Sequence, residues 1–200
     1  MAQERDPELR VHKDWLGFLQ PVGLVVSPLA LSKAQAVVNR NILPVQQALQ
    51  ALVRKDAEER AYLEPGGFPA FAQQVLGWEP GDLWGAPGAP PLPDDLPLPL
   101  PDYGETLEPT YAVPDPDRPG RFLLLVKELP TGAALDDPGP DEGRAWHASP
   151  QAKLERLLRE REVPAGLLFN GHIVRLTYAP RGETSGHLSR SEEHTSELQS

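Results

Sequence analysis

The stretch VPAGLLFNGHIVRLTY, residues 163–178, decides the fold of this chain. Its first half is an apolar run that predicts a strand over 163–169. Asn170-Gly171 follows, and this pair favours a two-residue hairpin, because both central positions of a type I′ turn need a positive φ. Along 172–178 apolar side chains then alternate, which predicts a partner strand with one face formed by Val174, Leu176 and Tyr178.

Two more strands are predicted upstream of this hairpin. The runs 106–113 and 121–129 are typical of strands, and they are joined by PDPDRPG, a segment rich in turn residues. The second run contains FLLLV at 122–126, which is apolar on both faces. We therefore expect it to be a central strand that is buried from two sides.

A helix is predicted between the two pairs of strands. Ser149-Pro150 offers an N-cap followed by Pro at the first helical position, where the missing N–H costs nothing. An apolar stripe at helical spacing continues to about Glu162 and consists of Leu154, Leu157 and Leu158. The order strand, strand, helix, strand, strand predicts an α/β fold with a mixed sheet.

Proline and glycine divide the chain into regions. Apolar spacing after the capping pair Ser27-Pro28 predicts a helical hairpin or a kinked helix pair that extends to about Leu63. Many of the 24 Pro lie in the next region, whose PPLP and LPLPLP runs favour extended chain, as a linker or as a strap on the surface. The predicted map is a mostly helical region over 1–78, a Pro/Gly-rich linker over 79–104 and the α/β core over 105–189.

Composition excludes several classes of site. The formal net charge is −10, so there is no broad basic surface for phosphate contact. The chain has no Cys, which excludes disulfides and Cys-ligated zinc, and its scattered His residues lack metal-ligand spacing, so no metal site is predicted. No apolar run approaches the roughly 20 residues of a membrane span, and no secretory signal pattern is present. The sequence predicts a cytoplasmic protein without a membrane partner.

The last eleven residues, RSEEHTSELQS at 190–200, resemble one reading frame of a short-read sequencing adapter. On this resemblance they are an adapter-derived tail, and the natural protein is expected to continue past about Ser189. Without them Lys+Arg falls from 19 to 18 and Asp+Glu from 29 to 26, so the formal charge becomes −8 and the chain stays acidic.

A strand that ends in Lys127 is followed by a helix with Gln151-Ala152 near its start and then by a strand that ends in Asn170-Gly171. In this order the core resembles, over roughly 105–178, the nuclease-like N-terminal domain of restriction enzymes. In that fold a strand carries an acid, one intervening residue and a Lys; carboxylates hold a divalent metal and the Lys orients the attacking water. Lys127 occupies the Lys position, and Gln151-Ala152 and Asn170-Gly171 match further positions of the family. Leu125 stands where the metal-binding acid is required. Lys127 is the one catalytic candidate, and no nuclease activity is predicted for this segment.

Four acidic residues lie close to Lys127 in the sequence. Strand alternation is expected to turn Glu128 to the opposite face from Lys127. An active metal-dependent endonuclease domain is one possible interpretation of the chain. It would need a carboxylate from elsewhere to replace Leu125. The other acids near this strand are Glu108, Asp115 and Asp117.

Five stretches carry a second resemblance: WLGFLQPVGLVVSP at 15–28, NRNI at 39–42, WHASPQ at 146–151, LFNG at 168–171 and YAPRGETSGHL at 178–188. Through these stretches the whole segment resembles the N-terminal region of Eco57I-like type II restriction-modification DNA adenine methyltransferases. The resemblance implies a downstream methyltransferase domain that binds S-adenosylmethionine. It implies no cofactor for residues 1–189 themselves.

The leading functional hypothesis is a non-catalytic N-terminal fragment that serves such an enzyme as a scaffold or a DNA-facing accessory domain. Its partners would be DNA, through the full-length protein, and the remaining domains of the parent protein. The residues expected at a DNA or interdomain contact are Arg175, Arg181 and His187. A protein-interaction module of a defence complex is the alternative, since the chain is acidic and carries a Pro-rich segment.

Overall fold

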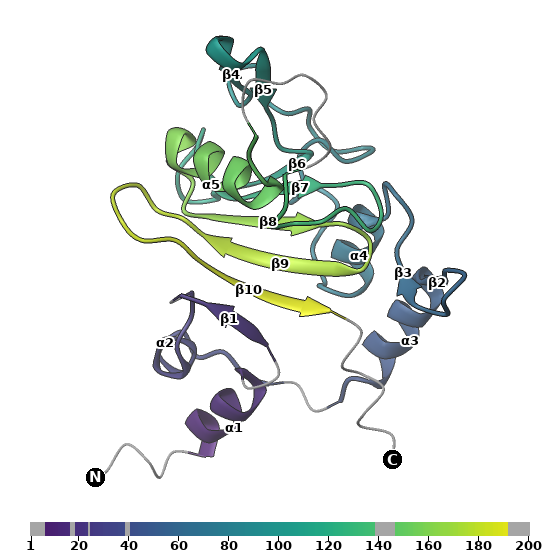
Figure 1. Ribbon diagram of the computed structural model, residues 1–200. Helices are drawn as coiled ribbons and strands as arrows, with labels where there is room; N and C mark the ends of the chain where they lie inside the picture. The colour runs from purple at the N-terminus through teal and green to yellow at the C-terminus, as the bar shows by residue number, and fades with distance from the viewer. Residues whose placement is uncertain (1–6, 17–18, 24, 39–40, 139–146, 192–200) are drawn as a thin grey trace.

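The fold is a six-stranded mixed sheet with a helix on each face, seen in a computed structural model that describes residues 7–16, 19–23, 25–38, 41–138 and 147–191 (Figure 1). Four predicted features lie partly or wholly outside these ranges: Gly17, Phe18 and Leu24 of the stretch at 15–28, Asn39-Arg40 of the NRNI motif, Trp146 of the WHASPQ motif, and the tail beyond Ser191. Within the described ranges, no helix combines the length and apolar character that a membrane span requires.

The strand order across the sheet is β1-β10-β9-β8-β7-β6. Only β7 and β8 are parallel neighbours, and every other pair is antiparallel, so the predicted α/β fold with a mixed sheet is confirmed. The bounds are β1 Gln20–Val22, β6 Tyr111–Pro114, β7 Phe122–Glu128, β8 Ala165–Phe169, β9 Ile173–Tyr178 and β10 Gly186–Ser191.

Strand β7 is central and is buried on both faces at its carboxyl half, as the FLLLV run predicts. Leu125 and Val126 are each 0% exposed, and they belong to two different core clusters on opposite faces of the sheet. The predicted strand 106–113 is interrupted, because Pro109 cannot donate a ladder hydrogen bond. Its first part, β5 Glu105–Leu107, pairs with β4 Leu98–Leu100 outside the main sheet.

Helix α5, Pro150–Arg161, connects β7 to β8 and covers one face of the sheet. Ser149 is the N-cap that was predicted, and its Oγ accepts a hydrogen bond from Ala152 N at 3.2 Å. The helix ends at Glu162, which adopts a left-handed conformation with φ of 53°. The predicted apolar stripe is buried against Leu125 and Leu168 and consists of Leu154, Leu157 and Leu158.

Helix α4, Phe68–Gln74, covers the other face. Phe68 is completely buried at the centre of an aromatic cluster, and its ring centroid lies 5.6 Å from that of Phe169 and 6.0 Å from that of Tyr111. Val174 and Leu176 pack against the same cluster, which confirms that these two alternate residues of β9 share a face.

Tyr111 in this cluster gives a prediction for alkaline pH. Burial, together with the charge of Glu128 and the hydrogen bond to it, raises the pKa of Tyr111 to about 12 from its ordinary value near 10. A raised phenol pKa contributes stability that is complete below pH 10 and is lost between about pH 10 and 12. We expect the free energy of unfolding to fall through this window. Chemical denaturation at a series of pH values measures this fall in the free energy of unfolding. Tyr111→Phe should show a smaller fall than the parent chain, whereas Tyr103→Phe should show the same fall as the parent chain. Equal falls in the parent chain and in both variants would contradict the prediction.

The Asn170-Gly171 pair makes the hairpin, but the predicted type I′ turn is wrong. Gly171 has φ of 86°, whereas neither Asn170 nor His172 has a positive φ, so the two consecutive positive φ values of a type I′ turn are not present. The reason is the buried Asn170 side chain, whose Oδ1 accepts hydrogen bonds from His172 N and Ile173 N. Its Nδ2 donates to Ala133 O, so the turn is built around a side chain and also fixes the loop after β7.

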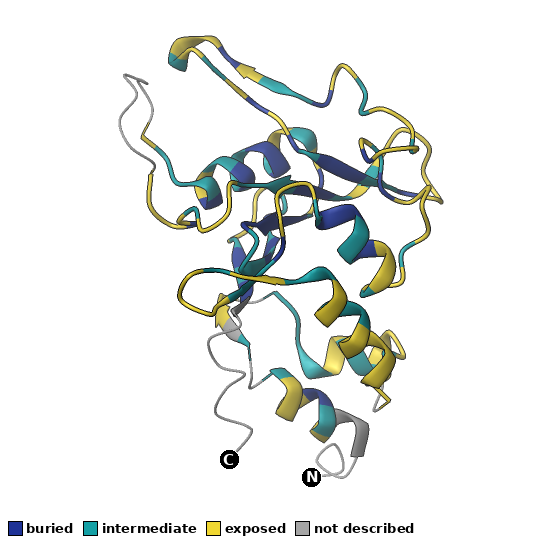
Figure 2. Ribbon diagram, turned by 90° about the vertical axis from the view of Figure 1, so that its right-hand side faces the viewer, coloured by how far each residue is buried: buried dark blue, intermediate teal, exposed yellow. Residues whose placement is uncertain are grey.

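The N-terminal region is helical, but the second predicted helix ends earlier than expected. The helices are α1 Pro7–Leu16, α2 Pro28–Lys33 and α3 Leu43–Leu52. After α3 the chain forms a short hairpin of β2 Arg54–Lys55 and β3 Ala61–Tyr62 instead of helix to Leu63. Asp56 is the reason, because its Oδ1 accepts from Glu58 N and Arg60 N and so stabilises a turn. Figure 2 shows that these helices are less buried than the sheet and α5.

The Pro-rich region lies against the body of the molecule as a strap. Leu96 and Leu100 are buried in the cluster beneath α5, and Leu83 belongs to the cluster beneath α4. Arg161 of α5 donates hydrogen bonds to the carbonyl oxygens of Leu96 and Pro97. The strap continues through β4 and a 3-10 helix, η2 Pro101–Tyr103, to β5. Of the two forms expected for this region, the strap is the one observed.

Candidate functional site

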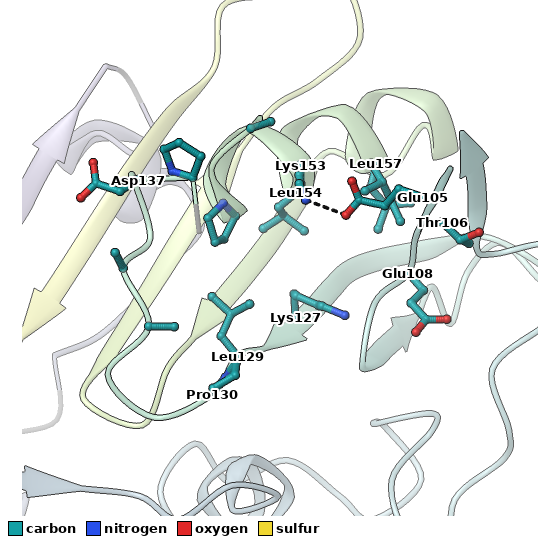
Figure 3. A pocket seen from close by; sticks show the side chains of 16 residues that line it. Glu105, Thr106, Glu108, Lys127, Leu129, Pro130, Asp137, Lys153, Leu154 and Leu157 are labelled. Carbon is teal, nitrogen blue, oxygen red and sulfur yellow. Dashed lines mark hydrogen bonds and ion pairs between the residues drawn. The ribbon is translucent and has the colours of Figure 1, made fainter. Parts of the chain in front are cut away.

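A cavity of about 620 Å³ lies at the carboxyl end of β7, between the first turns of α5 and strand β5 (Figure 3). Its walls are mostly apolar, and Lys127 enters it from β7. The main apolar lining residues are Leu107, Leu129, Pro130, Ala133, Ala134, Leu154 and Leu157, and the ionisable ones are Glu105, Glu108, Lys127, Asp137 and Lys153. The cavity is thus formed around the one catalytic candidate that the sequence offers.

Lys127 is a half-buried ammonium group inside this cavity. Burial lowers the pKa of Lys127, the charges of Glu108 and Glu105 raise it, and the charge of Lys153 lowers it further; the net direction is downward. No hydrogen bond or ion pair joins the Lys127 ammonium to the residues that the structure describes. Figure 3 shows its side chain extending toward the side of the cavity where Glu108 lies.

Lys153 and Glu105 form an ion pair across the same cavity. The Lys153 Nζ lies 2.6 Å from Glu105 Oε1, and both side chains are largely buried, with 21% and 15% of their surface exposed. The pair links α5 to β5 and so connects the strap to the helix. It also neutralises one carboxylate and one ammonium of the lining.

The carboxylates do not assemble into the metal site of the nuclease pattern. Leu125 faces the core beneath α5 and is 0% exposed. Glu128 lies on the opposite face, as predicted, where it accepts hydrogen bonds from Gly66 N and the Tyr111 hydroxyl. Asp115 lies in the β6–β7 turn, at the other end of β7 from Lys127, and pairs with Arg118. In the described part of the chain, no three His, Asp or Glu residues form a group that could hold a metal ion.

Arg175 and His187 come together in a second polar cluster, on β9 and β10. Arg175 is 7% exposed; its guanidinium donates to both carboxylate oxygens of Asp136, at 2.5 and 2.8 Å, and to Ser189 Oγ at 2.8 Å. Burial and the charge of Arg175 lower the pKa of His187, against the opposing charges of Asp136 and Glu155. The Arg175 guanidinium thus fixes the loop after β7 to the sheet.

Arg181 lies apart from these two residues. Its Nη1 is 3.1 Å from Glu162 Oε1 at the end of α5, and Arg121 binds the other oxygen of the same carboxylate. These two arginines lower the pKa of Glu162 through their hydrogen bonds and charges. With 71% of its side chain exposed, Arg181 is the sequence-predicted contact residue that is open to solvent.

Arg175 gives a stability prediction. Arg175→Met is expected to lower the free energy of unfolding by about 1–3 kcal/mol, because it removes hydrogen bonds to a carboxylate and to a buried hydroxyl. The hydrogen bond and charge of Arg175 also hold the pKa of Asp136 below its ordinary value, so this contribution is present above that value and is lost as the pH falls through the lowered pKa. Denaturation at pH 7 and at pH 3 should show a smaller mutational cost at pH 3. Equal costs at both pH values would argue against the pair.

Glu105, Lys153 and Asp136 are site residues that the sequence did not single out. Lys153 had a usable signal, since it lies one turn before Leu157 on the same side of the helix. Gln151, matched to the nuclease family from the sequence, is buried, and its side chain bonds to Thr177 and Glu155. It therefore connects α5 to β9.

The structure shows the succession β6, β7, α5, β8, in which α5 crosses between two parallel strands. The resemblance to restriction-modification proteins stays a prediction. Comparisons with protein-family models, with curated proteins and with solved structures found no match to this chain.

Proposed function

We propose that the chain is the N-terminal region of a bacterial DNA restriction-modification methyltransferase and serves it as a non-catalytic scaffold or DNA-facing accessory domain. The observation that carries this proposal is the combination of Lys127 on a central strand with the completely buried Leu125 two residues before it. A metal ligand at that position would have to replace a core side chain. The arrangement supports a nuclease-like scaffold without its metal-dependent chemistry.

The partners in this proposal are DNA and the remaining domains of the parent protein, in the cytoplasm. S-adenosylmethionine would bind the downstream methyltransferase domain. Arg181 is the residue best placed for a DNA contact, because it is exposed and its carboxylate partner is shared with Arg121. Arg175 supports the scaffold role instead, since its guanidinium is used within the fold.

DNA binding by the 200-residue chain tests the accessory role. We expect fluorescence anisotropy with a labelled duplex to show weak binding at low salt that falls as salt rises, because phosphate contacts release counterions. Arg181→Gln should weaken binding for all sequences and reduce the salt slope by about one. Arg118→Gln is the matched control, since Arg118 also pairs with a carboxylate and its side chain is 72% exposed. Absence of binding at low ionic strength would favour the protein-interaction module.

A metal-dependent endonuclease is the second candidate, and one observation favours it. Glu105 and Glu108 line the same cavity as Lys127 and act on its charge, so carboxylates from outside β7 come close to the Lys. Incubation of plasmid DNA with the chain and Mg²⁺ or Mn²⁺ tests this candidate. Cleavage that is abolished by Lys127→Ala and by Glu108→Gln, but retained in Lys55→Ala, would replace the scaffold proposal.

A further inference from the structure

Among the partly buried residues of the cavity wall, positive charges outnumber negative charges by one. Two ammonium groups, Lys127 and Lys153, and one carboxylate, Glu105, are partly buried in its walls. Glu105 is paired with Lys153 at 2.6 Å, so the Lys127 ammonium is left without a bonded counter-ion among the described residues. An ammonium group in an apolar surrounding is costly unless an anion pairs with it.

The remaining acidic residues of the lining lie at the rim. Glu108 and Asp137 are both exposed to solvent, whereas Lys127 is half-buried; the charge of Glu108 acts on Lys127, but no hydrogen bond or ion pair joins these two residues. They leave the single charge of Lys127 available inside, but they would repel an anion that carries several charges. The cavity therefore fits a monoanion better than a phosphate-rich ligand.

The other walls of the cavity are apolar, and the cavity is large enough to hold a small molecule. Leu129 of the segment after β7 faces the cavity together with Leu154 and Leu157 of α5, and small residues, Ala133 and Ala134, leave the space open. A volume of about 620 Å³ lies within the range of small-molecule sites, which are mostly apolar with a few polar groups that orient the ligand.

We propose that this cavity binds a small amphipathic monocarboxylate, with its carboxylate on the Lys127 ammonium and its hydrocarbon part against Leu129, Leu154 and Leu157. Lys127 provides orientation through one charge-assisted hydrogen bond, and the leucines provide most of the buried apolar area. A bound ligand would contact β7, α5 and the strap together and would thereby stabilise their packing. This inference goes beyond the proposed scaffold role. Its test uses no DNA, so the ligand site and the scaffold role can each be contradicted independently of the other.

Calorimetric titration of the full 200-residue chain with sodium decanoate, below its micelle concentration, tests the proposal. We expect one decanoate per chain and a weaker or undetectable interaction with 1-decanol, which has the same chain length without the charge. Lys127→Met keeps the unbranched apolar part of the side chain but removes the ammonium, and it should weaken decanoate binding by about tenfold or more. Lys55→Met is the matched control, because Lys55 is an exposed lysine paired with Glu59 far from the cavity lining.

A second variant keeps the test independent of Lys127. Ala134→Phe places a large side chain at an exposed position of the lining and should reduce decanoate binding by filling the cavity. Circular dichroism on each variant separates loss of the site from loss of the fold. The proposal is overturned if decanoate does not bind, if decanol binds equally well, or if either Lys127→Met or Ala134→Phe, correctly folded, binds decanoate like the parent chain.

Discussion

Phe68→Ala is expected to lower the free energy of unfolding by about 3–5 kcal/mol, the range for truncating a fully buried aromatic residue. The Phe68 side chain is 0% exposed at the start of α4 and lies between the rings of Tyr111 and Phe169. It also contacts the rings of Phe71 and Trp78, at centroid distances of 6.0 and 6.1 Å. Truncation of Phe68 therefore removes a ring that four other aromatic residues contact.

Urea denaturation followed by tryptophan fluorescence measures this effect, because Trp78 reports on the same cluster. The control is Leu123→Ala on β7, where the side chain is 44% exposed and less than about 1 kcal/mol is expected. A cost of Phe68→Ala no larger than that of the control would show that α4 does not close this face of the sheet.

Gly171→Ala is expected to cost about 2–4 kcal/mol, the second largest effect. At φ of 86° an alanine adds roughly 1 kcal/mol of backbone strain. Its Cβ would also lie 2.9 Å from the backbone oxygen of Leu63, which has little freedom to move because Leu63 N donates a hydrogen bond to Gly171 O at 2.9 Å. Overpacking of this kind typically adds about 1–3 kcal/mol.

Gly182→Ala separates the two contributions. Gly182 has nearly the same φ, 82°, but nothing lies within 4 Å of an added Cβ. It should therefore show the strain without the collision, at about 1 kcal/mol. Hydrogen exchange at the Leu63 amide should accelerate in Gly171→Ala and not in Gly182→Ala. If the two variants are equally destabilised, the close approach of Leu63, the residue after β3, to the hairpin does not contribute.

The secondary structure of the core could be predicted because its signals are local. The capping pair Ser149-Pro150 and the leucine stripe define α5 through neighbours along one helix, and the FLLLV run shows that both faces of β7 are covered. The turn type at Asn170 could not be predicted, because the Asn170 side chain bonds to Ala133, 37 residues away. The path of the Pro-rich strap likewise depends on Arg161, which is distant in sequence.

The site could be predicted only at its centre. Lys127 was singled out through the resemblance to the nuclease-like fold, in which it occupies the Lys position of a strand, and the cavity is formed around it. Glu105 and Lys153 were missed because their meeting depends on how the strap lies against α5, a contact between residues 48 apart. Arg175 was expected to be a contact residue, but strand pairing places it opposite Ser189, and the loop after β7 supplies Asp136. The sequence around a charged strand residue does not indicate which distant loop will cover that residue in the folded protein.

Strand β1 has a consequence for synthesis of the chain on the ribosome. Its residues Gln20–Val22 pair with His187, Leu188 and Ser189, which are added about 165 residues later. At roughly 5–20 residues per second, β1 is translated some 10–30 seconds before its partner exists. The sheet thus closes at this edge only after nearly all of the described chain has been made, so a nascent chain that pauses before residue 186 would expose β9 to neighbouring polypeptides.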